Sequence, residues 1–184
     1  MLRVVVVVLL LASLVANSAV AADFRGTSWG MTLSEVLAQH PGEIPADQRI
    51  GYLTYESKLA NFDVKIFYRF DDEGALIQAG YDIAADPILR ESIVADYQQL
   101  NQLLRKRYPQ SGEPEQSWVR QIFKDQPEHW DRAVRLGHVT YLWQHSLPGT
   151  SIEHSLQGSR RKIDHVLLYQ ALEQESEQGV LDQL

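Results

Sequence analysis

The sequence contains no cysteine among its 184 residues. This absence excludes disulfide bonds, thiolate catalysis, cysteine-ligated metal sites and lipid attachment at a bacterial lipoprotein cysteine. Packing of the core must therefore hold the fold without covalent cross-links. About 160 residues follow the amino-terminal segment, which is enough chain to build such a core.

An excess of positive charge is also missing. Arg3 is the only charged residue before residue 23, so residues 23–184 carry 16 basic and 24 acidic side chains, a net charge of −8. Nucleic-acid binding needs a basic face opposite the phosphates, and electrostatic membrane binding needs clusters of basic residues. We therefore expect no nucleic-acid partner and no charge-driven membrane attachment.

The longest apolar run, from Val4 to Ala16, is too short to span a membrane, which takes about 20 apolar residues. It follows the basic start at Arg3 and precedes small residues that end at Ala22. This order is typical of a secretory signal peptide, here residues 1–22. We expect a periplasmic or secreted protein with no membrane span after signal cleavage.

The sequence lacks the motifs that would identify a particular enzymatic activity. The sequence has no Gly-x-Ser-x-Gly elbow, no Walker loop, no dinucleotide-binding glycine pattern and no His-Glu-x-x-His pair. The sequence therefore predicts no catalytic residue, no cofactor and no metal site, and it leaves the ligand-binding residues open.

The remaining pattern predicts an α+β fold with helices packed on antiparallel sheet, possibly as two halves, 23–84 and 85–172, that each run from helix to β-meander. Residues 173–184 are rich in Gln and Glu and predict a flexible tail. In the first half, a capping box from Thr32 to Glu35 begins a helix. Alternating residues from Val64 to Phe70 and the return from Ala75 to Ile83 predict a hairpin with Ile77 on its apolar face.

In the second half, Asp86 is the expected cap of the longest helix, which ends with the basic triplet 105–107. A short strand is expected over 118–123 and a short helix over 127–136, followed by the strands 138–146, 151–157 and 163–170. The basic triplet fits either a solvated helix end or a partner site, with the solvated helix end favoured.

Two histidines are the only ionisable pair that the pattern brings together. If the last hairpin pairs Leu156 with Ile163, its apolar residues face one another and His154 lies directly opposite His165. Such a pair has no evident third metal ligand, so we expect a pH-sensitive or hydrogen-bonded pair without metal. The alternative is a small metal-dependent or hydrolytic enzyme that uses these two residues.

Phe24 and Trp29 precede the first helix, where large aromatic side chains usually pack on the core, although an exposed docking site is the alternative. The segment Phe24 to Val36 resembles the opening of exported bacterial proteins of unknown function, with the pattern Phe-x-Gly-x-x-Trp-Gly-Met-Ser/Thr-x-x-Glu-Val. The later Tyr68 to Asp71 segment is similar to theirs as well. Gly30 to Val36 is also similar to outer-membrane assembly proteins of the BamE/SmpA type. Neither resemblance implies catalytic residues.

These patterns together predict a non-catalytic binding or assembly module of the cell envelope. Its partner is expected to be an envelope protein or a small ligand, bound on the sheet or in the groove between the two halves.

Overall fold

The computed structural model describes residues 24–84, 92–159 and 162–172. The predicted signal peptide, 1–22, and the predicted tail, 173–184, lie outside these residues. The helices are α1 (Leu33–Gln39), α2 (Ile93–Arg107) and α3 (Trp130–Arg135), with 3-10 turns η1 (Gln121–Phe123) and η2 (Pro127–His129). The strands are β1 (Asp47–Arg49), β2 (Tyr52–Leu59), β3 (Phe62–Phe70), β4 (Leu76–Ile83), β5 (Glu115–Trp118), β6 (Val139–Leu147), β7 (Thr150–Gly158) and β8 (Ile163–Ala171). The predicted α+β class is confirmed.

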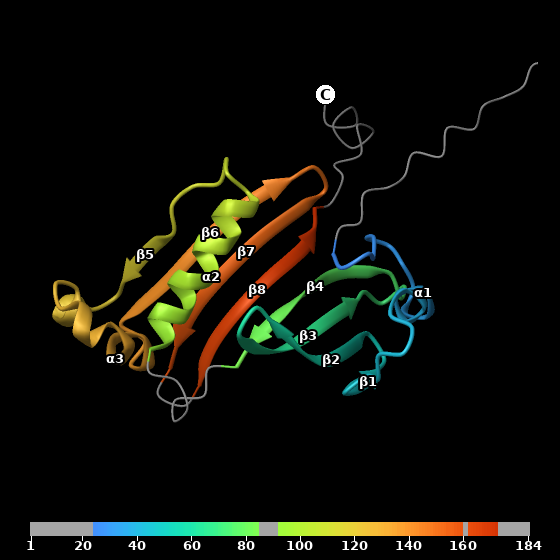
Figure 1. Ribbon diagram of the computed structural model, residues 1–184, viewed down its shortest axis with the longest axis horizontal. Coiled ribbons are helices and arrows are strands. Elements are labelled where there is room, and N and C mark those ends of the chain that lie inside the picture. Colours follow the sequence, from blue (N-terminus) through green and yellow to red (C-terminus); the bar gives the residue numbers. More distant parts are fainter. Residues whose placement is uncertain (1–23, 85–91, 160–161, 173–184) are drawn as a thin grey trace, which may run out of the picture.

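The strands form one antiparallel sheet in the order β1-β2-β3-β4-β8-β7-β6-β5. The first four strands and the last four strands therefore occupy opposite ends of the sheet, as Figure 1 shows. The two ends meet where β4 pairs with β8, from Gln78 opposite Gln170 to Asp82 opposite Val166. Strands about 90 positions apart in the sequence thus lie side by side at the centre of the sheet.

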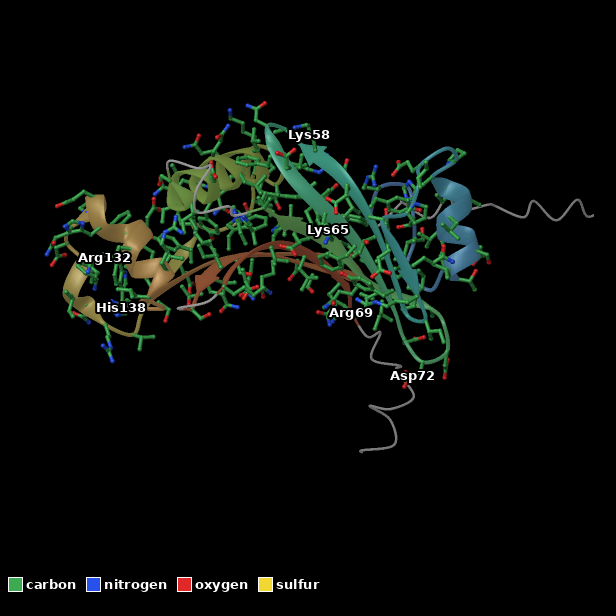
Figure 2. All side chains as sticks on the ribbon, turned by 90° about the horizontal axis from the view of Figure 1, so that it is seen from below. Lys58, Lys65, Arg69, Asp72, Arg132 and His138 are labelled. Atoms are coloured by element: carbon green, nitrogen blue, oxygen red, sulfur yellow. The ribbon has the colours of Figure 1, made fainter. Side chains whose placement is uncertain are left out.

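One face of the sheet carries most of the core. Alternate residues of β3 are buried from Phe62 to Phe70, which confirms the predicted period of two. Leu100 and Leu104 of α2 belong to the same apolar cluster as these strand residues. Figure 2, a perpendicular view, shows α2 standing on one side of the sheet. Within the described part of the chain, no helix is long and apolar enough to cross a membrane.

The predicted capping box begins α1. Thr32 Oγ1 accepts from the Glu35 backbone N–H at 3.4 Å, and Glu35 Oε2 accepts from the Thr32 backbone N–H at 2.8 Å. The helix ends at Gln39, just before the Pro41-Gly42 dipeptide that cannot continue it. This local prediction is confirmed because a capping box depends only on residues within one turn.

The prediction that Ile77 lies on the apolar face of β4 is wrong. A β-bulge shifts the register between Arg69 and Phe70, so that Phe70 pairs with Leu76 while Arg69 pairs with Gln78. The extra residue, Ile77, is 38% exposed, and Leu76 is buried in its place. At a bulge, the inward-facing position moves by one residue along the strand, so a prediction based on strict alternation assigns the wrong side chain to the core.

Two element boundaries also differ from the prediction. Helix α2 begins at Ile93 with Ser92 as its cap, whose hydroxyl accepts from the Ala95 N–H at 3.1 Å. The expected cap, Asp86, lies outside the described residues. The short strand β5 begins at Glu115 and ends at Trp118, so it precedes rather than spans the predicted segment 118–123. It pairs with β6, and this tertiary pairing sets its position.

Candidate functional site

The two histidines lie on the same face of the sheet, but the predicted pairing between them is wrong. His154 is opposite Leu167, and His165 is opposite Leu156, so the two histidines are diagonal neighbours. The observed turn is closed by the Ser159 N–H, which donates to the Lys162 carbonyl at 2.7 Å. Placing the turn one residue later moves the register by two residues, which preserves the side-chain faces.

The diagonal arrangement still brings the two imidazoles together. The Nε2 atoms of His154 and His165 lie 2.9 Å apart, so one of them donates the shared hydrogen to the other. The ring of Tyr97, from α2, stacks on His154 with centroids 4.3 Å apart, and both histidines are at most 1% exposed. Burial, and then repulsion from His165, holds the pKa of His154 well below its ordinary value. His154 is thus a neutral part of the core.

The buried pair is a poor candidate for the enzyme alternative. Glu153 and Asp164 point to the other face of the sheet, as expected, because they alternate with the buried residues of β7 and β8. Among the described residues, no group of three His, Asp or Glu side chains is placed to hold a metal ion. A substrate also has no access to imidazoles that are covered by the core.

A groove lies instead on the helix-covered face, where the two ends of the sheet meet. We call it the inter-half groove, and its volume is about 370 Å³. Its floor is formed by Tyr81 of β4 and by Leu167 and Tyr169 of β8. The residues around this floor are Phe24, Arg25, Leu59, Leu100, Leu103, Leu104, Arg107 and Tyr108. Tyr81 and Leu167 are directly paired across the junction of β4 and β8, so the groove lies on that junction.

A tight turn positions one rim of the inter-half groove. The backbone groups of Phe24 and Thr27 exchange two hydrogen bonds, of 3.2 and 2.8 Å, around Arg25 and Gly26. Both central residues have positive φ, 47° for Arg25 and 85° for Gly26, as a type I′ turn requires. A left-handed conformation is costly for arginine, so the surrounding structure must hold it there.

Packing of Phe24 supplies that constraint. Its ring lies 5.2 Å from the ring of Tyr81, 5.1 Å from that of Tyr169 and 5.6 Å from that of Tyr68, measured between centroids. Phe24 is 4% exposed, which confirms the packing interpretation for this residue. The next residue, Arg25, is consequently fixed at the rim, where its guanidinium donates to Glu43 Oε1 at 3.2 Å.

The end of α2 forms the other cationic part of the rim. Arg107 Nε donates to the Tyr108 hydroxyl at 3.2 Å, and the guanidinium lies 5.6 Å from the centre of that ring. In the described part of the chain, Arg107 makes no ion pair with an acidic side chain. No acidic side chain of the described residues therefore compensates its positive charge at the groove, in a protein that is acidic as a whole.

Three tyrosine hydroxyls add polar groups to the groove. Burial raises the pKa values of Tyr81 and Tyr169, and the hydrogen-bonded contact with Tyr108 raises that of Tyr169 further. The positive charges of Arg25 and Arg107 partly offset this rise in the pKa of Tyr81. The phenols of Tyr81 and Tyr169 therefore stay neutral at neutral pH and can donate hydrogen bonds to a ligand.

The sequence suggested part of this site but not its assembly. The sequence favours a solvated helix end for the basic triplet 105–107, and this description fits Arg105, which pairs with Glu113 outside the groove. Arg107 is exposed as well, and it also lines the groove. Trp29 is partly buried and donates from Nε1 to Thr150 Oγ1 at 2.8 Å, so it links the first half to the β6–β7 turn.

Comparison with protein-family models, with curated proteins and with solved structures found no match to this chain. The resemblance to exported bacterial proteins and to the BamE/SmpA type therefore stays a prediction. The function has to be argued from the geometry of the site.

Proposed function

We propose that this protein is an exported, non-catalytic binding module of the cell envelope, and that it binds a small ligand in the inter-half groove. The groove supports this proposal because it combines an apolar floor and walls with a few convergent polar groups. That combination is typical of small-molecule sites, whose volumes begin at about 300 Å³. The groove lies at the junction between the two halves, one of the two regions where we expect binding.

The apolar part of the groove supplies the driving force for binding. Leu59, Leu100, Leu103 and Leu167 present hydrocarbon to the space, and Leu103 is 41% exposed. Covering such surface with a ligand releases water and contributes about 25 cal/mol per Å² of apolar area. The space of about 370 Å³ corresponds to roughly a dozen water molecules of about 30 Å³ each, which is enough for a small organic compound.

The architecture of the sheet supports the interpretation of two related halves. The first half contains α1 followed by β1 to β4, and the second contains α2 followed by β5 to β8, with α3 inserted between β5 and β6. Each meander contributes its final strand to the antiparallel β4–β8 junction. Joining two α-then-β units through equivalent last strands creates a groove that neither unit has alone.

Localisation in the envelope rests on the predicted signal peptide, residues 1–22. The enzyme alternative would require access to His154 and His165, and their burial disfavours it. Binding without catalysis is consistent with a groove whose described lining residues include no Asp, Glu or His to act as a general base.

Titration of the leucine-methyl-labelled protein with octanoate, octan-1-ol and octyltrimethylammonium tests the binding proposal by NMR. We expect at least one of these compounds to shift the methyl signals of Leu100, Leu104 and Leu167. Leu156 belongs to a different apolar cluster, so its signal should remain in place. If none of the three compounds shifts the groove methyls at millimolar concentration, the inter-half groove is not a small-ligand site.

A groove-filling substitution provides the matched test of location. Leu103→Trp places an indole in the groove and should abolish the methyl shifts. Leu136→Trp is the control, because Leu136 is similarly exposed, at 39%, and lies outside the groove. Equal binding by the wild type and by Leu103→Trp would place the ligand elsewhere.

A further inference from the structure

We infer that the ligand of the inter-half groove is a singly charged anionic amphiphile, a carboxylate on an apolar body of about ten heavy atoms, whose head contacts Arg107 and whose body covers the leucines. This inference rests on the proposed binding function and adds the chemical class of the ligand. It is carried by charge complementarity within the groove and by the limited space.

The sign of the charge comes from the lining residues. Among the described residues that line the groove, two are arginines and none is acidic. This local excess of positive charge contrasts with the net charge of −8 of residues 23–184. A cationic ligand would be repelled by Arg107, and a neutral ligand would not use the positive charge of this guanidinium.

The number of charges follows from the ion pairs. Arg25 already donates to Glu43 at 3.2 Å, so that carboxylate offsets its charge. Among the described residues, Arg107 donates only to the Tyr108 hydroxyl, which leaves four of its five N–H groups for a ligand or for water. One cation without an ion-pair partner in the described part of the chain matches one anionic head. Arginine and carboxylate also match in shape, since two parallel N–H···O bonds can form between them.

The position of the head group follows from the tyrosines. Arg25, Arg107 and Tyr81 line the same groove. A carboxylate at the mouth can therefore accept from Arg107 and from a tyrosine hydroxyl, while its tail extends over Leu167 and between the side chains of Leu59 and Leu104. Each polar contact of the head is charge-assisted, which makes it stronger than a neutral hydrogen bond.

Calorimetry tests the inference by comparing the affinities of three compounds that share an octyl chain and differ in the charge of the head group: octanoate, octan-1-ol and octyltrimethylammonium. We expect octanoate to bind at least about tenfold more tightly than octan-1-ol, with octyltrimethylammonium weakest. If octan-1-ol binds as tightly as octanoate, the groove remains a binding site and the charge assignment is refuted. If none binds, the proposed function itself fails.

Substitutions on α2 assign the effect to one side chain. Arg107→Gln should weaken octanoate binding by about tenfold and leave octan-1-ol binding unchanged. Lys106→Gln is the matched control, because it removes the same charge from the adjacent position, which does not line the groove. Arg107→Glu should reverse the order, so that octyltrimethylammonium binds more tightly than octanoate. Equal losses from Lys106→Gln and Arg107→Gln would show only a general effect of charge and would overturn the inference.

Discussion

The close contact between α3 and the end of β7 gives a sharp test of the fold that carries the groove. A side chain added at Gly158 would overlap the Val134 carbonyl oxygen and lie 2.9 Å from its carbonyl carbon. It would also lie 3.3 Å from the Arg135 Cα. All three are backbone atoms, so no side-chain rotation can relieve the overlap. Gly158→Ala must therefore push α3 and β7 apart.

The size of the effect follows from this geometry. An ordinary carbon–carbon contact is about 3.5 Å, so the Val134 carbonyl carbon alone must retreat by about 0.6 Å. Ala133 and Val134 are fully buried, and the displacement therefore disturbs the second apolar cluster as well. Overpacking of this kind costs about 1–3 kcal/mol, and we expect about 3 kcal/mol here because only backbone can move. For a protein of this size, the melting temperature should fall by about 6–12 °C.

Thermal unfolding followed by circular dichroism measures this change. Gly112→Ala is the matched control, since a Cβ at Gly112 meets no atom within 4 Å and this glycine does not have a positive φ. The control should be neutral or should stabilise the protein by about 0.4–1 kcal/mol, because alanine restricts the unfolded chain. A melting temperature of Gly158→Ala within about 1 °C of the control would refute the close approach of α3 and β7.

Two further predictions concern pH and export. The pKa of His154 is lowered in the folded protein, so the unfolded chain binds protons more readily. As the pH drops below 6.5, the free energy of unfolding should therefore decrease by up to about 1.4 kcal/mol per pH unit. The free energy of unfolding, measured with urea between pH 8 and 5, should depend less on pH in the His154→Gln/His165→Gln double variant. The remaining dependence should come from His40, whose pKa is also lowered by burial. An unchanged pH dependence in the double variant would contradict this reasoning. Export predicts a species beginning at Ala22 or Asp23 outside the cytoplasm, and amino-terminal sequencing that found Met1 on cytoplasmic protein would refute it.

The sequence by itself determined the local elements of this protein. The Thr32–Glu35 capping box and the alternation of buried residues in β3 both follow from residues that are close in the chain. The same holds for the face on which His154 and His165 lie, because side-chain parity along a strand depends only on spacing. Such patterns are visible without knowing which strands pair.

Only the tertiary structure decided how those elements meet. The turn before Lys162 lies one residue later than predicted, which changes the histidines from opposite to diagonal neighbours while leaving their face unchanged. The bulge that exposes Ile77 likewise depends on the partner strand. Hydrophobic periodicity specifies faces, but it does not distinguish registers that differ by two residues.

The inter-half groove is the clearest case of a feature that no local pattern contains. Arg25, Tyr81, Arg107 and Tyr169 come from four segments that span 145 positions of the chain, and pairing of β4 with β8 brings them together. Each of these residues, taken alone, fits an ordinary structural role in a turn, a strand or a solvated helix end. Their convergence depends on long-range strand pairing, which is favoured by the summed burial of the whole sheet rather than by any one segment.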